Sequence, residues 1–496
     1  MRTIRVIILV LFVICHLSFD ICSAATLTKI RYKPYDDKIR VVFEMEGEAY
    51  YRIKPQDKGF AVQLLNCKTE NNESRDYAIN DWVVKELKVR KEGNDTVVYF
   101  PLEYPVEHKI YPLGSPNRIV IDFGREFSKV ETRSRIAEGV EYSFVTKGGP
   151  GGYQGIHVLR VDPKKAEIFP ALAMRSPTFF QSLANIFTPW QKISRIHFYK
   201  EKVSSIEDKH NALAGINGTF FDYTGRPLGV LLINGELISY PIHNRTSVII
   251  DSKNNASIDR VFLDGYVEIN NRRYPITGVN QPPENNDVII FTKHYGELTG
   301  TGGQGYELTI ENGKVARRHI GNSRIPDNGY VVYFSPMFVE NVFGSVKAGD
   351  FAKISINIMP FSSEIKNNLL HVMGGGPRLL KDGRLYVSKH YERFRSDVGE
   401  GRAARTAVGI TKDGQILMVA VDGKPRRIVR QGESYSIGAT LEELAGILLS
   451  IGAYEALNLD GGGSTTMTVN NRVINRPVEN NGSRPVSNAL LVRDLD

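Results

Sequence analysis

Alternating apolar and polar positions dominate the first quarter of the chain and predict short β-strands. Residues 41–45 alternate as a half-buried strand requires. Gly93-Asn94-Asp95 separates two strand-like runs, 87–90 and 97–100, in the manner of a hairpin turn. Residues 26–127 are therefore predicted to form a small β-sandwich.

From residue 147 onward the pattern predicts strands and turns with a few helices. One helix is well marked, because Thr440 and Glu443 form a capping box and Gly452 stands where the helix would end. Residues 456–459 then form an apolar strand that delivers Asp460 to a glycine-rich turn. The predicted fold class is α+β, with the β-sandwich followed by a strand-rich α+β domain.

A second apolar segment covers residues 179–196 and carries its large side chains at helical spacing. Thr188-Pro189 marks a fresh helix start, so two short helices are predicted here. Packing in the core is the favoured role. A lid over a ligand site and contact with a membrane interface stay open as alternatives.

The N-terminus differs from the rest of the chain. Arg2 and Arg5 precede an apolar run, 6–15, and then small residues, which is the order of a secretory signal. The run is too short to span a bilayer, so no transmembrane anchor is expected. We predict a signal peptide over residues 1–25 and a secreted protein in the periplasm or cell envelope of a bacterium. Cys67 would be the single cysteine of the mature protein, which excludes an intrachain disulfide.

Length and composition indicate a soluble protein of more than one domain. The 496 residues exceed what one core usually organises. Residues 128–146 are charged with little apolar pattern, so they are predicted to be a linker before a second domain at 147–496. The formal charge of +8 suits anionic envelope polymers and equally a surface kept soluble. Since no basic patch is concentrated, no nucleic-acid partner is expected.

Five segments hold the residues best suited to chemistry. They are Ala214–Asp222 with Pro227–Gly229 and Ile233–Glu236; Gly374–Leu380 with Lys381–Gly383; Arg402–Ile410; Val419–Gly423; and Asn458–Met467. Glycine clusters of this kind bring backbone N–H groups close to a ligand, and they also make tight turns. One such cluster is a weak signal, but five in order are a strong one.

In their order, spacing and residue identities these segments resemble the phosphodiester glycosidase family, which includes bacterial exopolysaccharide-related members. The resemblance covers about residues 147–496. It implies a hydrolase that splits the bond between an α-linked sugar, with N-acetylglucosamine as one candidate, and a phosphodiester in cell-envelope or exopolysaccharide glycans. The runs 106–111 and 117–123 of the first domain are similar to the end of an AMIN domain, which implies contact with peptidoglycan.

A sugar phosphodiester offers an anion, hydroxyl groups and an anomeric carbon that becomes cationic in the transition state. That carbon needs a carboxylate as nucleophile or as base for water; Asp460 is the first candidate and Asp422 the second. The alternative for each is a turn aspartate that bonds its own loop. The anion needs arginine and free backbone N–H groups. The predicted substrate-binding residues are Arg405, Thr406, Asn217, Phe220, Asn458, Gly375, Gly376, Gly461, Gly462, Gly463, Ser464 and Thr465.

Two other functions stay open. A metal-dependent phosphodiesterase would need clustered ligands, but the ten histidines are scattered without His-X-His spacing. No cofactor is therefore expected, although an oxygen-only calcium site stays open. The second alternative is a non-catalytic envelope protein that binds glycan in the same pocket. Convergence of Asp460 and Arg405 on one open space would favour the enzyme.

Overall fold

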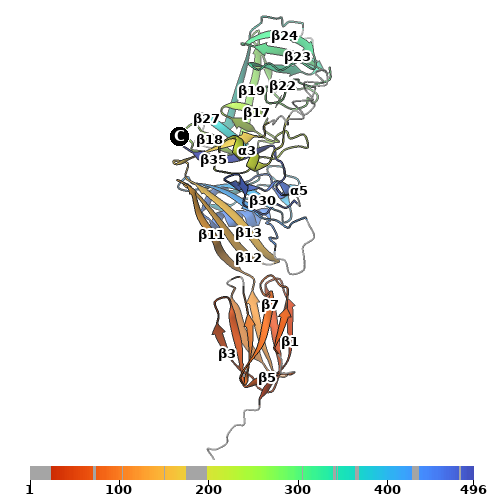
Figure 1. Ribbon diagram of the computed structural model, residues 1–496. Helices are drawn as coiled ribbons and strands as arrows, with labels where there is room; N and C mark the ends of the chain where they lie inside the picture. Colours follow the sequence, from red (N-terminus) through yellow and green to blue (C-terminus); the bar gives the residue numbers. More distant parts are fainter. Residues whose placement is uncertain are drawn as a thin grey trace, which may run out of the picture. The chain divides into compact units, whose positions relative to one another are not determined.

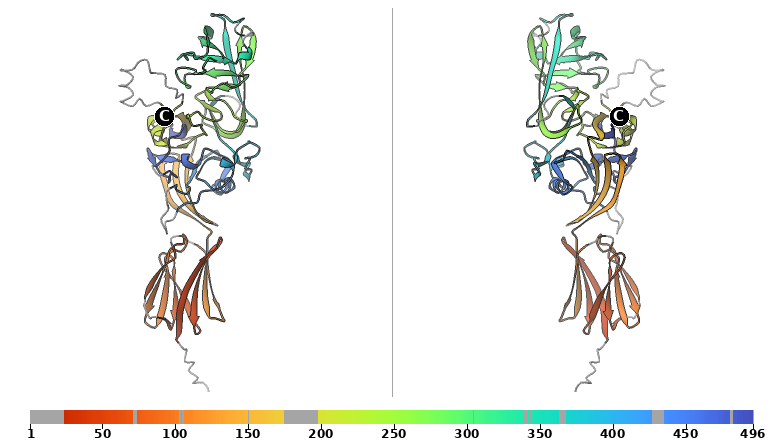
Figure 2. Two further views of the ribbon diagram at one scale, coloured as in Figure 1. Left: turned by 90° about the vertical axis from the view of Figure 1, so that its right-hand side faces the viewer. Right: turned by 90° about the vertical axis from the view of Figure 1, so that its left-hand side faces the viewer.

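In the computed structural model the chain divides into two compact units (Figures 1 and 2). The first unit runs to Lys129 and takes in the short segment Gly148–Gly152; the second holds Val130–Lys147, Tyr153–Val429 and Tyr435–Asp496. The structure describes residues 24–70, 74–102, 104, 106–149, 151–174, 198–303, 305–338, 342, 344–362, 368–426, 435–479 and 482–495. Each unit is described here by itself.

The first unit consists of two five-stranded sheets. One has the order β5 (Cys67–Thr69), β1 (Ala25–Pro34), β2 (Lys38–Glu46), β10 (Arg118–Gly124), β9 (His108–Leu113). The other has the order β3 (Tyr50–Pro55), β4 (Phe60–Leu65), β8 (Asp95–Phe100), β7 (Glu86–Glu92), β6 (Arg75–Ala78).

Both sheets of the first unit bury one common core. Strand β2 turns Val41, Phe43 and Met45 inward at every second position, which confirms the predicted alternation. Phe60 and Phe100 come from the other sheet and stack with ring centres 5.3 Å apart. The predicted hairpin is confirmed as β7–β8. Its turn contains Gly93 at φ +63°, a conformation that favours glycine.

The second unit is built from four sheets. The largest has the order β11 (Phe127–Ala137), β12 (Val140–Gly149), β13 (Gly152–Val161), β31 (Ile416–Val421), β30 (Arg405–Thr411), β32 (Ala453–Asn458), β28 (Arg378–Lys381), β29 (Arg384–Leu385). A five-stranded sheet has the order β14 (Ala166–Leu172), β35 (Asn488–Asp494), β15 (Ala214–Asn217), β33 (Met467–Val469), β34 (Arg472–Val473).

The remaining two sheets come from the middle of the sequence. One has the order β17 (Glu236–Ser239), β16 (Leu231–Ile233), β27 (Leu369–Gly374), β18 (Thr246–Asp251), β19 (Ala256–Ile269), β20 (Arg272–Pro275), with β26 (Ala352–Pro360) also paired to β19. The other has the order β21 (Gly278–Val279), β22 (Val288–Phe291), β25 (Gly329–Phe334), β23 (Tyr306–Glu311), β24 (Lys314–Ile320).

Helices are few and short among the described residues, so the protein is mostly β rather than α+β. They are α3 (Val203–Lys209), α5 (Ser396–Gly399) and α6 (Leu441–Ser450), with 3-10 turns η2 (Pro336–Phe338) and η3 (Gly462–Ser464). Helix α6 confirms the predicted capping box, since the Thr440 hydroxyl accepts the Glu443 N–H and the Glu443 carboxylate accepts the Thr440 N–H. Its apolar face, including Leu444 and Leu448, packs on the largest sheet.

Residues 128–146, predicted as a linker, instead form most of the hairpin β11–β12. Strand β11 exposes most of its side chains, and every second residue from 129 to 135 is charged. Strand β12 is partly buried, with Val140 in the core of the second unit. Because residues 128–133 of the edge strand β11 are exposed on both faces, the segment lacks the apolar pattern by which a half-buried strand is recognised.

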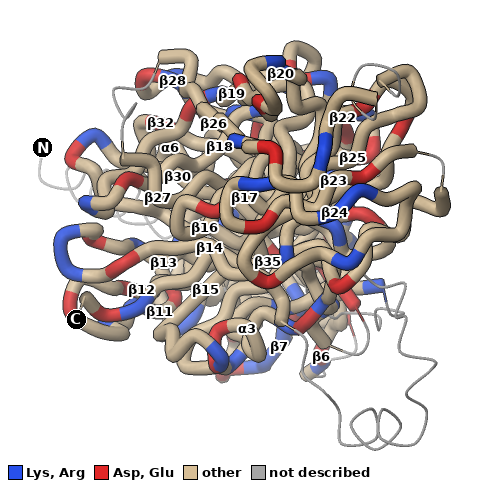
Figure 3. The backbone as a smooth tube through the Cα atoms, turned by 90° about the horizontal axis from the view of Figure 1, so that it is seen from above, with Lys and Arg blue, Asp and Glu red and all other residues tan. Residues whose placement is uncertain are grey.

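The predicted helical segment 179–196 lies outside the described residues. Within the described residues, no helix has the length and apolar character needed to cross a membrane. In the view of Figure 3, Lys and Arg are interspersed with Asp and Glu along the chain.

Candidate functional site

Antiparallel pairing brings four of the five predicted segments to one edge of the largest sheet. Strand β30 begins at Arg405, which pairs with Val421 at the end of β31. Asn458, the last residue of β32, pairs with Ala407 on the other side of β30. Strand β28 begins where β32 ends, with Arg378 opposite Leu457. Neighbouring antiparallel strands start and end at the same edge, so the loops around Gly376, Arg405, Asp422 and Asp460 lie together.

The fifth segment joins this edge through Asn217, the last residue of β15. The Asn217 Nδ2 donates to the Asp460 carbonyl at 2.6 Å. Its Oδ1 accepts from the Thr406 hydroxyl at 2.7 Å and from the Thr466 N–H at 3.1 Å. The Asp460 N–H in turn donates to the Gly218 carbonyl at 3.3 Å. Asn217 is 1% exposed, so the structure places it and Thr406 as buried supports of the Asp460 loop.

Asp460 presents its carboxylate at the surface of this loop. The side chain is 16% exposed. Burial raises its pKa to about 6, while the Ser464 hydroxyl, the Arg484 guanidinium and the Gly461 N–H oppose that rise. Arg484 Nη2 lies 3.7 Å from Asp460 Oδ2. A partly desolvated carboxylate that ionises near neutral pH is suited to acid–base or nucleophilic work.

Asp422 lies at the same edge but is enclosed. Its side chain is 4% exposed, and Oδ2 is 3.2 Å from His157 Nε2. Its Oδ1 accepts the Arg476 N–H at 2.8 Å. The Tyr142 hydroxyl is 2.9 Å from His157 Nδ1 and completes a buried chain. Both carboxylate oxygens thus have protein partners, which is the geometry of a structural aspartate.

Arg405 is buried and bonded to the backbone. Its Nε, Nη1 and Nη2 donate at 3.0 Å to the carbonyl oxygens of Ala439, Val398 and Gly401 respectively. Its exposed fraction is 3%. Arg405 therefore connects the start of β30 to the backbone near α5 and just before α6. Its predicted contact with phosphate stays a prediction, which this geometry does not favour.

Arg484 is the cation that the structure places beside Asp460, and the sequence prediction missed it. Its Nη2 donates to the Ser464 hydroxyl, and its guanidinium carbon lies 5.5 Å from the centre of the Phe221 ring. The side chain is 40% exposed. Its Nε is buried without a hydrogen-bond partner in the described chain. Arg484 stands in a polar loop with no glycine cluster, so the motif pattern held no signal for it.

The predicted glycine loops are closely packed rather than open. The N–H groups of Gly375 and Gly376 donate to the carbonyls of Thr246 and Asn458, and that of Gly462 donates to Ala404. The expectation that these loops offer free N–H groups is therefore wrong for those three. A Cβ at Gly375 would come within 2.4 Å of Leu457. These glycines let neighbouring backbones approach each other.

Gly461 and Gly463 are restricted by similar contacts. A Cβ at Gly461 would lie 2.9 Å from the Ala404 carbonyl oxygen, and one at Gly463 would lie 2.4 Å from Glu479 Oε1. Gly462, at φ +58°, has open space where a side chain would be. Of the glycine candidates, Gly462 is therefore the one that leaves room for a ligand.

Polar atoms without a protein partner gather around the Asp460 loop. Of the twelve buried side-chain atoms that lack a partner in the described chain, five lie on this loop or beside it: Asn458 Oδ1, Thr465 Oγ1, Thr466 Oγ1, Arg484 Nε and Asn488 Nδ2. The rest of each amide is used: Asn458 Nδ2 donates to the Gly376 carbonyl, and Asn488 Oδ1 accepts the Thr219 N–H. Buried polar groups are nearly always satisfied, so this concentration is typical of a site that binds water or a polar ligand.

Phe220 and Glu392 lie near the Gly376 loop at this edge. The Phe220 ring is half-buried, with its centre 5.8 Å from that of Phe394. Glu392 is fully buried and accepts from the Thr246 N–H at 2.8 Å and the Arg378 N–H at 2.9 Å. It thereby fixes the Gly376 loop against β18, a role that the sequence analysis did not predict.

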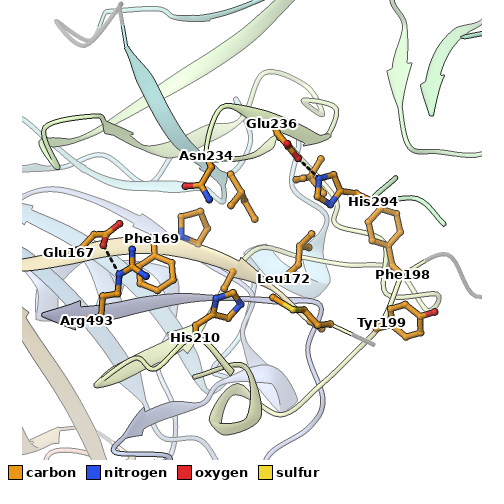
Figure 4. Close-up of a pocket in the computed structure, with 16 residues that line it drawn as sticks. Glu167, Phe169, Leu172, Phe198, Tyr199, His210, Asn234, Glu236, His294 and Arg493 are labelled. Carbon is orange, nitrogen blue, oxygen red and sulfur yellow. Dashed lines mark hydrogen bonds and ion pairs between the residues drawn. The ribbon is translucent and has the colours of Figure 1, made fainter. Parts of the chain in front are cut away.

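A separate cavity of about 510 Å³ lies away from this edge (Figure 4). Apolar side chains of β14 and the β16–β17 turn line it. Two ion pairs border it, Glu167 with Arg493 and Glu236 with His294. Met174 and Phe198 also line it, on either side of the segment 175–197 that lies outside the described residues. Ile233, Asn234 and Glu236 of the first predicted segment line this cavity, but none of the predicted catalytic or substrate-binding residues does. In the described chain, no three His, Cys, Asp or Glu side chains form a group suited to a metal ion.

Comparison with known proteins finds similarity to one enzyme family over part of the second unit. Residues 300–493 match the phosphodiester glycosidase family. The match includes four of the five predicted segments and the residues Asp460 and Arg484. An uncharacterised protein of Rickettsia conorii is 24% identical over 223 residues, which is 43% of this chain and 76% of that protein.

Two relatives are phosphodiester glycosidases by name. The N-acetylglucosamine-1-phosphodiester alpha-N-acetylglucosaminidases of Bos taurus and Homo sapiens are 28% and 26% identical over 127 and 123 residues. Each match covers 23% of this chain, and the chain spans only 22% of the length of those two relatives. The resemblance to these enzymes is therefore distant and partial.

Solved structures show the same fold over nearly the whole chain. A hypothetical protein from Synechocystis superposes with a TM-score of 0.60 at 21% identity, covering 94% of this chain and 80% of its own. A Burkholderia pseudomallei protein superposes with a TM-score of 0.54 at 18% identity, covering 90% of this chain and 97% of its own.

Proposed function

We propose that this protein is a phosphodiester glycosidase that hydrolyses the bond between an α-linked sugar and a phosphodiester, with N-acetylglucosamine as the first sugar to test. The observation that carries the proposal is the juxtaposition of the Asp460 carboxylate and the Arg484 guanidinium, whose nearest atoms lie 3.7 Å apart. The family match over residues 300–493 supplies the reaction class.

The chemistry divides between these two side chains. The ionised Asp460 carboxylate faces the anomeric carbon, where positive charge develops, as nucleophile or as base for water. The Arg484 guanidinium contacts the phosphate, where negative charge develops as the C–O bond breaks. A phosphomonoester is a good leaving group, so a strong general acid is not required. Phe220 borders the sugar, and the buried Thr465 and Thr466 hydroxyls, which have no protein partner in the described chain, lie behind the loop that carries Asp460.

A single labelling experiment tests the proposal. The protein is incubated with a methyl diester of α-N-acetylglucosamine 1-phosphate, and with the corresponding glucose and galactose diesters, in oxygen-18 water. Cleavage of the C–O bond yields free sugar carrying the label and unlabelled methyl phosphate. Sugar 1-phosphate with methanol would instead show P–O cleavage, and an absence of any product would favour the glycan-binding alternative.

The pH dependence of turnover follows from the pKa of Asp460. Its folded-state pKa of about 6 means that the carboxylate is ionised above that pH and protonated below it. If the ionised form is required, kcat/KM falls tenfold for each pH unit below about 6. A pH–rate profile on the small diester checks this. A rate that rises on acidification would show instead that protonated Asp460 acts as the acid.

Removal of the first unit tests whether hydrolysis depends on the second unit alone. All five predicted segments lie in the second unit, and the first unit has its own core. Deleting residues 26–126 keeps β11 intact and is expected to leave hydrolysis of the small diester largely unchanged, while weakening attachment to isolated cell-wall sacculi. Sedimentation with sacculi and a turnover assay measure both. Loss of turnover in a folded truncated protein would show that the first unit contributes to the site.

The proposed function includes a cellular location. The signal-like residues 1–25 and the AMIN-like pattern of the first unit support an exported protein of the bacterial periplasm or envelope, held near peptidoglycan. Its substrate would then be an envelope or exopolysaccharide glycan.

A further inference from the structure

Beside the Asp460 loop, aromatic and arginine side chains stack into one surface, which we call the aromatic–arginine platform. The Arg260 guanidinium carbon lies 4.9 Å from the centre of the Phe361 ring and 4.6 Å from that of Tyr391. The Arg245 guanidinium carbon lies 3.8 Å from the centre of the Phe394 ring. The members of the platform are Arg245, Arg260, Phe361, Tyr391, Arg393 and Phe394.

The platform keeps large aromatic faces in solvent. Tyr391 is 65% exposed and Phe361 is 51% exposed. Arg260 holds Tyr391 in place by donating from Nη1 to its hydroxyl at 2.8 Å. Arg393 has φ +55°, a left-handed conformation that is uncommon for a residue other than glycine. Exposed aromatic rings held in fixed positions, in a loop that tolerates backbone strain, are typical of binding surfaces.

The charge of the platform is positive. Arg245 donates to the carbonyls of Glu392 and Arg393, and Arg260 donates to the Asn244 carbonyl, so the partners of both are neutral. The Arg245 guanidinium makes two hydrogen bonds, both to these carbonyls. That of Arg260 also makes two, one to the Asn244 carbonyl and one to the Tyr391 hydroxyl. Because a guanidinium has five N–H groups, each arginine keeps donors for an outside anion. The Glu392 carboxylate points inward to Thr246 and Arg378. Arg245 and Arg393 also lower the pKa of His243, after the larger effect of burial.

The platform begins where the candidate site ends. Phe394 contacts Phe220 at 5.8 Å, and a Cβ on Gly376 would lie 2.9 Å from the Phe394 ring. The Gly376 N–H donates to the carbonyl of Asn458, two residues before Asp460. A chain-like ligand with one linkage at Asp460 can therefore continue over Phe394 to Tyr391.

We infer that the aromatic–arginine platform binds the continuing chain of a polymeric substrate, a glycan whose sugars are joined by phosphodiesters. Sugar rings stack on Tyr391 and Phe361, and phosphates contact Arg260 and Arg393. The inference rests on the proposed function for the identity of the linkage. It adds that the substrate is an anionic polymer rather than an isolated sugar diester.

The test separates binding from hydrolysis. Affinity is measured by calorimetry in the Asp460→Asn background, which should leave the polymer uncut, with a polymer of N-acetylglucosamine 1-phosphate as the probe. Chitin oligosaccharide and single-stranded RNA are the neutral and nucleic-acid comparisons. The variants are Tyr391→Ala, Arg260→Gln and the aromatic replacement Tyr391→Trp. Phe351→Ala is the matched control, because Phe351 is 74% exposed and stacks with Lys314 away from the platform.

Tyr391→Ala and Arg260→Gln are each expected to weaken polymer binding by about tenfold or more, with Tyr391→Trp and Phe351→Ala close to the parent. Binding should weaken as salt is added. In an otherwise unaltered enzyme, the same two variants should keep kcat/KM on the small diester. Equal polymer affinity in all variants, or tighter binding of RNA or chitin than of the polymer, would overturn the inference. Failure of the parent enzyme to cleave the small diester would instead overturn the proposed function, and polymer binding that still depends on Tyr391 would leave the platform standing.

Discussion

Replacement of Asp460 by Asn is expected to lower kcat on the small diester by about 10²–10⁴-fold, because one catalytic acid–base group contributes about that much. Asn has nearly the same size and keeps the backbone bonds of the loop with Gly218 and Asn217. KM should therefore change little. Steady-state kinetics with product analysis for free sugar measures the effect.

The same substitution should stabilise the fold at neutral and higher pH. Asp460 has a folded-state pKa of about 6, against the ordinary value of 3.8, so ionising it above pH 6 costs stability. Removal of that charge is worth about 3 kcal/mol at pH 8 and less than about 1 kcal/mol at pH 4, by the usual conversion of pKa shift to free energy. Urea unfolding of both proteins at pH 8 and pH 4 checks the sign.

Asp422→Asn is the matched control. It removes a carboxylate that accepts from Arg476 N–H and lies against His157, so it should destabilise the protein while the folded fraction keeps its turnover. Full activity in a folded Asp460→Asn protein, together with loss of activity in Asp422→Asn, would transfer the catalytic role to Asp422.

The two arginines near the site are expected to respond in opposite ways. Arg484→Ala removes a charged contact to the phosphate, and such contacts contribute about 1.5–3 kcal/mol, so KM should rise roughly 10–100-fold. Because Arg484 lowers the pKa of Asp460, its removal should also move the acidic limb of the pH–rate profile to higher pH. Unfolding free energy should change little, since the side chain is 40% exposed.

Arg405→Ala should instead lower the unfolding free energy by about 3 kcal/mol, because it removes three hydrogen bonds of a buried guanidinium to backbone carbonyls. Its KM per folded molecule should stay near the parent value. Urea unfolding and kinetics on both variants distinguish the pair. A stable Arg405→Ala protein with a raised KM would restore Arg405 as the phosphate contact.

The sequence by itself determined the local elements with strong patterns. The alternation in β2 and the glycine turn of β7–β8 depend on neighbours a few residues apart, as does the capping box of α6. The apolar strand before Asp460 and the three glycines after it were also read from local sequence, but the loop is held in place by Asn217 and Gly218, which are distant in the chain. The clustering of the five segments was also foreseen, through their resemblance to one family.

Tertiary structure alone decided which polar groups are free. Arg405 was the sequence's choice for the phosphate, but the carbonyls of Val398, Gly401 and Ala439 take up its donors, and no local pattern announces such bonds. Arg484 reaches Asp460 across 24 residues of chain, so their pairing exists only in the fold. The hairpin at 128–146 was missed for a related reason, because an edge strand exposed on both faces has the composition of a linker until its partner strand is known. Hydrogen bonds and burial depend on atoms that are distant in sequence. They decide whether a charged side chain stabilises the site from within the protein or is available to contact a substrate.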